Sequence, residues 1–407
     1  MENPLPQSVN PVELGARLQQ ARKAAGITQQ AAADHLEMAR TTITAIEKGT
    51  RRVQPSELAR LVGLYGREVG ELLRPGKPVE PLIVQLRSTL APGREVLPGL
   101  EEHAGEMQRL AEDYVELERI CGASLPRRYP PPYEIGGVTP ELAAEDVATA
   151  ERNRLGLGDG PILNLRELLE SEVGLRIFYL KLPSRIAAMY AFNDALGGCV
   201  VVNSDHPPER RRMSLAHDYA HFLTNRYQPE VSVLGGYERR PQHERFAEAF
   251  ARAFLMPAAA LSRRYHELHR ARKGGITPAD LCMLADFYRA SWQALTRRME
   301  ELELIPSGTY DRLQQAGFRV GEARVLLDLP ERPSSSELLP TRYRLLAVEA
   351  YERGDLSEGQ LARFLRVDRV EARRIVAELS SRVTVSEEGD IGTTTLDFGR
   401  PLSGAEA

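Results

Sequence analysis

Two histidines four positions apart are the residues of this sequence best placed to hold a metal ion. His217 and His221 flank the segment Asp218-Tyr219-Ala220. In an α-helix this spacing puts both imidazoles one turn apart on the same face, as two zinc ligands require. The chain has 8 histidines, enough for such a pair to arise by chance. A third ligand is therefore needed before the pair indicates a metal site.

A downstream glutamate could be that ligand. Residues 244–255 predict a helix in which Glu244 lies in line with Ala247, Ala251 and Leu255, on the apolar, inward stripe. A carboxylate in that position needs a partner, and a metal ion would be one. Glu248, one turn further along the same helix, is an alternative ligand.

Taken together, these features resemble the ImmA/IrrE metallopeptidase family over about residues 160–300. The histidine pair, the glutamate helix ending in Leu255-Met256-Pro257 and the upstream run Val202-Asn203-Ser204-Asp205-His206-Pro207 carry the resemblance. It implies zinc bound by His217, His221 and Glu244, with water at the fourth position. The sequence departs from the family at Glu248, where Asn is usual, and at Asp218, where Glu is usual.

The departure at Asp218 concerns catalysis. In the family, the glutamate after the first histidine takes a proton from zinc-bound water. Aspartate is shorter by about 1.5 Å, a misplacement large enough to cost on the order of a hundredfold in rate. We therefore favour a domain that retains zinc and serves sensing or partner binding over an efficient protease. Two core histidines without a metal remain an alternative interpretation.

The first 75 residues predict short helices separated by tight turns. Thr28 caps one helix, which ends near Leu36, and the next runs from Ala39 to Lys48 after a three-residue turn. Ala39, Ile43 and Ile46 are expected to face inward, which leaves Arg40, Thr41, Thr44 and Lys48 outside. In a helix-turn-helix, the second helix of such a pair enters the major groove of DNA.

This segment resembles the Xre/Cro family of helix-turn-helix repressors, through Ala21-Arg22, Gly26-Ile27-Thr28-Gln29, Ile43 and Ile46-Glu47-Lys48-Gly49. The resemblance implies an internal salt bridge between Arg22 and Glu47. It also implies phosphate contacts by Gln29, Lys48, Arg51 and Arg52 and base contacts at Arg40, Thr41 and Ala45. Glu37 stands where the family has Gly in the turn, so strain is expected if its φ is positive. A module that binds only protein is the alternative.

Pro-rich and Gly-rich breaks divide the rest of the chain. We predict a DNA-binding domain at 1–75, a linker with a long amphipathic helix at 76–155 and a metallopeptidase-like domain at 156–305. A helical region at 306–380 and a polar, loosely ordered tail at 381–407 follow. The fold class is multidomain and mostly α, with an α+β central domain whose small sheet lies between residues 162 and 203.

The C-terminal helices predicted at 357–365 and 370–379 are also spaced like a helix-turn-helix. Ser357 and Gln360 form a capping box at the start of the first. A second DNA contact is one interpretation. A helical subunit contact, or a cover for the central core, is the interpretation we favour from sequence.

Composition narrows the class of protein. The chain of 407 residues is 42% hydrophobic and 27% charged, with no apolar run of the roughly 20 residues that a membrane span needs. Met1 to Asn10 does not resemble a secretory signal, so a cytoplasmic protein is expected. Cys121, Cys199 and Cys282 form no Cys-x-x-Cys pair, which argues against a disulfide framework or a thiolate zinc site. The net charge of −4 does not exclude a basic DNA-binding module.

Three functions compete. The first is a transcription regulator, a repressor or autoregulator in a stress, plasmid or phage-related locus, that binds a double-stranded operator as a homodimer. The second is an active zinc endopeptidase that cleaves a repressor protein. The third is an antitoxin-like protein that holds a toxin through its C-terminal half. Position 218 separates the first two.

Overall fold

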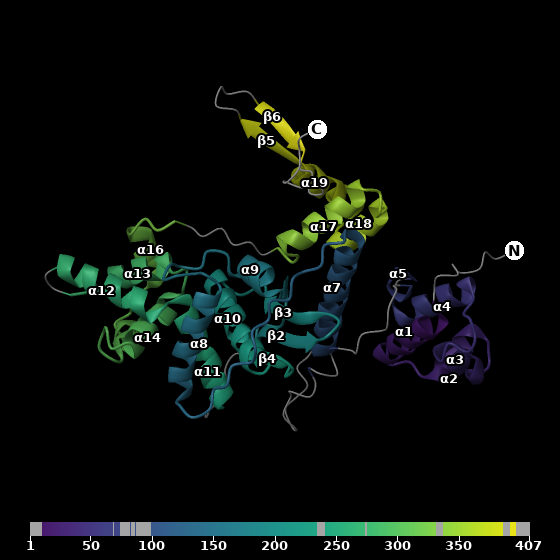
Figure 1. Cartoon of the computed structure of the whole chain (residues 1–407), viewed down its shortest axis with the longest axis horizontal. Helices are drawn as coiled ribbons and strands as arrows, with labels where there is room; N and C mark the ends of the chain where they lie inside the picture. Colours follow the sequence, from purple (N-terminus) through teal and green to yellow (C-terminus); the bar gives the residue numbers. More distant parts are fainter. Residues whose placement is uncertain are drawn as a thin grey trace. The chain divides into compact units, whose positions relative to one another are not determined.

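The computed structural model describes residues 10–67, 69–73, 82, 86, 99–233, 241–272, 275–330, 337–385 and 391–395. The chain divides into two compact units, Met1–Pro81 and Leu82–Ala407, which are described separately. The described residues are mainly helical, with one four-stranded sheet in the second unit (Figure 1). This confirms the predicted fold class. Within these ranges no helix has the length and apolarity needed to cross a membrane.

The first unit is a small helical bundle. It comprises α1 (Pro11–Ala24), α2 (Gln29–Leu36), α3 (Arg40–Glu47), α4 (Pro55–Tyr65) and the short α5 (Val69–Leu72). The Thr28 side chain accepts a hydrogen bond from the backbone N–H of Ala31 and so caps α2. Glu37 ends α2 with a φ of 58°, the left-handed conformation expected of the residue at that turn.

One inward position in this bundle was predicted wrongly. Ala39 is exposed, because it is the residue before α3 rather than part of the helix. Ile43 and Ile46 are buried as expected, in a core shared with Leu18, Leu36 and neighbouring apolar side chains. The inward face of α3 is therefore set by residues within the helix alone.

The second unit is built on a mixed sheet. Its strands are β1 (Arg176–Leu180), β2 (Ile186–Asn193), β3 (Gly197–Asn203) and β4 (Glu230–Val233), in the order β1-β3-β2-β4. β1 runs parallel to β3, and β2 runs antiparallel to both of its neighbours, β3 and β4. β4 was not predicted, because its four residues lie in a region that otherwise has helical periodicity.

Helices pack on this sheet and on one another. Before the strands come α7 (Leu100–Cys121), α8 (Pro140–Arg154) and α9 (Leu165–Leu168), which continues into the π-helical turn η1 (Leu169–Val173). α10 (Pro208–Thr224) packs on β2, β3 and β4, and α11 (Gln242–Leu255) packs on α8 and α10. The helices α12 (Ala258–Ala271), α13 (Pro278–Phe287), α14 (Trp292–Glu301), α15 (Thr309–Gln315) and α16 (Val320–Leu326) follow.

The last described elements are three helices and a hairpin. They are α17 (Thr341–Glu352), α18 (Glu358–Leu365), α19 (Arg369–Ser380), β5 (Ser381–Val385) and β6 (Ile391–Thr395). β5 and β6 pair antiparallel. The sequence predicted a loosely ordered tail after Ser380, and the hairpin corrects that prediction. Its strands are rich in Val and Thr, whose branched side chains favour extended backbone. The remaining residues of the predicted tail lie outside the described residues.

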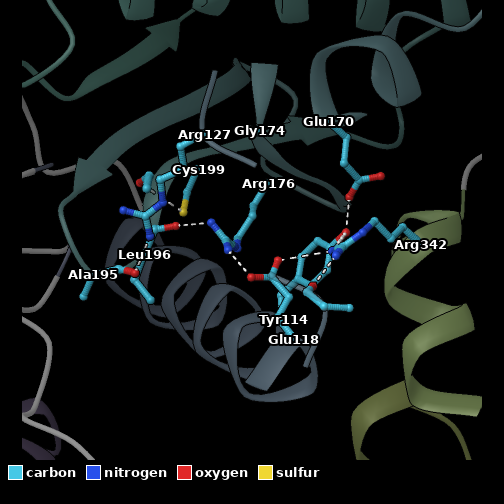
Figure 2. A network of polar contacts seen from close by, with 12 residues as sticks. Tyr114, Glu118, Arg127, Glu170, Gly174, Arg176, Ala195, Leu196, Cys199 and Arg342 are labelled. Atoms are coloured by element: carbon cyan, nitrogen blue, oxygen red, sulfur yellow. Dashed lines mark hydrogen bonds and ion pairs between the residues drawn. The ribbon is translucent and has the colours of Figure 1, made fainter. Parts of the chain in front are cut away.

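A buried polar network ties α7 to the sheet and to α17 (Figure 2). Arg176 on β1 donates to Glu118 on α7 at 2.7 Å. Arg342 on α17 donates to the Tyr114 hydroxyl at 3.2 Å and to Glu118 at 3.3 Å. The Tyr114 hydroxyl in turn donates to Glu170 at 2.5 Å. The C-terminal helices are thus anchored to the central domain through Arg342, which is partly exposed and pairs with the buried Glu118.

Candidate metal centre and nucleic-acid interface

His217, His221 and Glu244 lie together where α10 meets the first turn of α11. The Nε2 atoms of the two histidines are 3.0 Å apart. The Glu244 oxygens lie 3.6 Å from His217 Nε2 and 3.3 Å from His221 Nε2. Ligands at 2.0 to 2.1 Å from a tetrahedral zinc ion are about 3.3 Å apart. The three side chains therefore fit the donor set of a zinc site.

Burial and charge act together in this cluster. Burial raises the pKa of Glu244, but the hydrogen bond to His221 and the charges of both histidines outweigh it and lower that pKa to about 2. Burial lowers the pKa of His221, yet the hydrogen bond and charge of Glu244 leave it raised. Glu244 is thus a carboxylate at neutral pH, the form that binds a metal.

Asp218 is fully buried beside these ligands. One carboxylate oxygen, Oδ1, accepts a hydrogen bond of 2.8 Å from the Ser232 hydroxyl on β4. The other, Oδ2, has no hydrogen-bond partner among the described residues. Burial raises the pKa of Asp218 to about 7, although the charge of His221 and the Ser232 hydrogen bond act in the opposite direction. One of the two carboxylate oxygens is therefore buried without a hydrogen-bond partner among the described residues.

Three residues at this site were not found by sequence reasoning. Glu230 on β4 and His243 on α11 form a second group of donors with Glu244, and His243 Nε2 lies 3.7 Å from Glu244 Oε1. Ser232 is the partner of Asp218. β4 is too short for its alternation, Glu230-Val231-Ser232-Val233, to predict a strand, and the only signal for His243 is that it adjoins the predicted ligand. Glu248, the alternative ligand, belongs to neither donor group of the described residues.

The first unit contains the ion pair predicted between α1 and α3. Arg22 donates from Nε to Glu47 at 2.5 Å and from a terminal nitrogen at 3.0 Å. Its other terminal nitrogen donates to the Ile27 carbonyl at 2.8 Å. The Glu47 carboxylate also accepts from Gln29 at 2.8 Å and from Gln19 at 3.4 Å. Both charged side chains are buried, so the pair holds the helices together rather than facing a ligand.

The residues predicted to contact DNA are not equally available. Four of them are exposed: Arg40, Thr41, Lys48 and Arg52. Two more on α3, Thr44 and Ala45, are half-buried. The amide of Gln29 is engaged by Glu47. Arg51 donates to Glu57 at 2.9 and 2.7 Å. A phosphate contact by either of these two side chains would have to exchange an existing hydrogen bond.

Comparison with known families agrees with both halves of this description. Residues 13–74 match a helix-turn-helix domain, and residues 170–300 match the IrrE N-terminal-like domain. Within this chain, a segment that matches a helix-turn-helix domain thus precedes one that matches an ImmA/IrrE domain. The first match covers α1 to α5, and the second contains the four-stranded sheet with α10 and α11, including all the donor residues described above.

Searches of whole proteins add little to these two domains. No curated protein matches the sequence. Among solved structures, ComR from Streptococcus suis is 12% identical over 91% of this chain and 88% of its own, with a TM-score of 0.15. PlcR from Bacillus thuringiensis, solved with the peptide PapR7 and DNA, is 10% identical over 89% of this chain and 91% of its own, with a TM-score of 0.16.

Proposed function

We propose that this helix-turn-helix and ImmA/IrrE fusion is a sequence-specific transcription regulator. Its central domain would hold zinc and respond to a signal or partner rather than cleave peptides efficiently. The observation that carries the proposal is the outward face of α3, where Arg40, Thr41 and Lys48 are exposed while the charged pair beneath them is buried.

Each exposed position on α3 suits a different contact with DNA. Arg40 is the first residue of the helix, and the N-terminal side chains of a recognition helix reach base edges. An arginine there can donate two hydrogen bonds to guanine, and a threonine methyl can contact thymine. Lys48 and Arg52 follow the helix and suit phosphate contacts, which position the protein without reading sequence.

The test is to select binding sites for the full-length protein from a pool of random DNA duplexes. We expect Arg40→Ala to lose discrimination at one or two base positions by about tenfold. Lys48→Ala should weaken binding to every sequence and lower the slope of its salt dependence by about 1. Lys23→Ala, an exposed change on α1, is the control. If Arg40→Ala keeps the full sequence preference of that control, α3 is not the reading helix.

We also propose that the protein binds as a homodimer. One helix-turn-helix module contacts a half-site, so a two-fold dimer reads a palindrome with half-sites about one helical turn apart. Light scattering of the selected complex should give two chains for each duplex. One chain bound to a single asymmetric site would contradict this.

For the central domain, the donor distances support zinc held by His217, His221 and Glu244. Zinc bound there would polarise a water molecule. Asp218 is buried and hydrogen-bonded to Ser232, and its side chain is one carbon shorter than the glutamate that usually removes the proton. We therefore assign this domain a sensing or partner-binding role.

The second candidate function is an active endopeptidase that cleaves a repressor. The observation in its favour is that position 218 keeps a carboxylate, with one oxygen that has no partner among the described residues. Efficient cleavage of a repressor by the wild-type protein, abolished in Asp218→Ala, would establish this function. Cleavage that is absent in both, with DNA binding intact, supports the regulator.

A further inference from the structure

The pair α18–α19 repeats the local geometry of the pair α2–α3. A hydroxyl side chain caps the first helix of each pair, Thr28 in one and Ser357 in the other. Both first helices are 8 residues long, and both end at a non-glycine residue with a φ of 58°, Glu37 and Arg366. A residue other than Gly seldom takes this conformation, so its recurrence at the same step is informative.

The buried positions of the two pairs also share one register. Counted from the two caps, five buried residues of one pair correspond to five of the other: Ala32, Ala33, Leu36, Ile43 and Ile46 to Leu361, Ala362, Leu365, Ala372 and Ile375. The pairs differ at Phe364 and Glu47, which are buried while their counterparts His35 and Val376 are not. In both pairs three residues separate the two helices, and the second begins at Arg40 and at Arg369. The two pairs therefore share the spacing of their main inward positions.

The helix before each pair extends the likeness. α1 and α17 end close to a glycine with positive φ, Gly26 at 69° and Gly354 at 80°, and each packs on the pair that follows. Even a side-chain contact recurs, since Thr44 contacts Gln29 in the first pair and Arg373 contacts Glu358 at the corresponding positions. The three helices α17–α19 therefore have the arrangement of a helix-turn-helix.

The outward positions of α19 that correspond to the reading positions of α3 carry mostly arginine. Arg369 corresponds to Arg40, and Val370 to Thr41. Arg373 and Arg374 take the places of Thr44 and Ala45, and their side chains are 65% and 69% exposed. Val370 is 73% exposed at the N-terminal end of the helix. Three arginines and an apolar side chain on one face suit guanine edges, phosphates and a thymine methyl.

We propose that α19 is a second recognition helix that binds the major groove of duplex DNA. The chain would then contact DNA at two places in one molecule, so binding at one site raises the effective concentration at the other. This goes beyond the proposed function, which needs only α3. Each helix can be disabled by its own substitutions, so the two assignments can fail separately.

The ion pairs on α19 do not prevent this role. Arg373 pairs with Glu358 at 2.8 Å and Arg374 with Glu371 at 2.5 Å. Exposed pairs of this kind contribute little to stability, so the arginines can exchange carboxylates for phosphates. The sequence between β5 and β6 contains Glu387, Glu388 and Asp390. Because these acidic residues would repel phosphates, we assign the DNA contact to α19 alone.

The test uses full-length protein carrying Arg40→Ala and Lys48→Ala, so that α3 no longer dominates. Duplexes selected from a random pool by the wild-type protein are the probe. In this background we expect Arg373→Ala with Arg374→Ala to weaken binding a further tenfold or so and to lower the salt slope by about 2. Val370→Glu, which adds a negative charge to the same face without removing an arginine, should weaken binding as well.

Arg319→Ala is the matched control. Arg319 precedes α16 in the second unit of the chain, and its side chain is 77% exposed. It pairs with a glutamate three residues away, as Arg374 does. It should leave both affinity and salt slope unchanged. The proposal is overturned if the α19 variants, with unchanged melting temperatures, bind DNA as the control does. It is equally overturned if they change only the molar mass in light scattering, because α19 would then be a contact between subunits.

Discussion

Each of the two units buries charged side chains, but the hydrogen bonding of these side chains differs between the Arg22–Glu47 pair and Asp218. Around Arg22 and Glu47, every charged nitrogen of the arginine donates, and the carboxylate accepts from Arg22, Gln19 and Gln29. Asp218 is at least as deeply buried, but it receives one hydrogen bond, from Ser232, and its Oδ2 has no partner among the described residues.

The difference separates a structural site from a reactive one. A fully paired network in a low-dielectric interior is rigid and specifies one arrangement of helices. A carboxylate oxygen buried without a partner costs free energy that folding alone does not recover. Its position beside three side chains spaced for a metal makes the surroundings of Asp218 the part of the molecule prepared for a ligand. The predictions below test this contrast.

The largest effect is expected at Arg22. Arg22→Ala leaves Glu47 charged and buried, which should cost about 3 to 5 kcal/mol, enough to unfold a module of this size. The measurement is thermal unfolding of the full-length protein, followed by DNA binding at a temperature below the melt. An unchanged melting curve would show that the pair is not structural, and the contrast would fail.

A pH-dependent effect on stability is expected at Glu170, a buried carboxyl group that accepts a hydrogen bond from Tyr114. Burial raises its pKa from 4.5 to about 7, although the hydrogen bond from Tyr114 lowers it. A raised folded-state pKa stabilises the fold below pH 4.5, and this contribution disappears as the pH rises through 7. Glu170→Gln should remove this pH-dependent loss of unfolding free energy, which is on the order of 3 kcal/mol at most.

The measurement for Glu170 is urea unfolding of the wild type and the variant at pH 5 and pH 8. The variant should gain stability relative to the wild type at the higher pH. Glu172→Gln serves as the control, because Glu172 is more exposed and pairs with the surface residue Arg128 at 3.0 Å. Equal differences at both pH values would mean that Glu170 is ionised throughout.

A smaller loss is expected at Ser232. Ser232→Ala removes the hydrogen bond to Asp218 Oδ1, so both carboxylate oxygens are buried without a partner, at a cost of about 1 to 3 kcal/mol. Ser232→Thr keeps the hydroxyl and should recover most of it. Stability equal to the wild type in Ser232→Ala would show that Asp218 obtains another partner, such as water, and is not poised for a ligand.

The smallest effect is expected at Arg51. Its side chain is 38% exposed and pairs with Glu57, which is 16% exposed. Because water solvates part of this pair, Arg51→Ala should cost no more than about 1 kcal/mol. A loss as large as that of Arg22→Ala would show that partial exposure does not distinguish the two pairs.

Most of the first unit could be predicted from sequence because its signals are local. Thr28, the turn at Glu37 and the spacing of Ile43 and Ile46 each report their own helix within a few residues. Ala39 was assigned wrongly because helix boundaries are the least certain part of such a prediction. The Arg22 to Glu47 contact was available only from the resemblance, since no local pattern joins α1 to α3.

The central site was predicted in part. His217 and His221 lie on one helix, so their spacing was sufficient, and Glu244 was found because it lies on an apolar face. Ser232 and Glu230 were missed because β4 has four residues, too few for a periodicity. The hydrogen bond to Asp218 joins that edge strand to α10, a contact fixed by packing of the sheet on the helix and not by neighbouring sequence.

Zinc content measured together with peptidase activity tests the contrast between the two units most directly. After reconstitution with zinc, the wild-type protein should contain about one zinc ion per chain, and His217→Ala should contain none. Asp218→Glu should hold the same amount of zinc as the wild type and cleave a repressor or model peptide on the order of a hundredfold faster. Absence of zinc from the reconstituted wild type, or zinc retained in His217→Ala, would contradict the account.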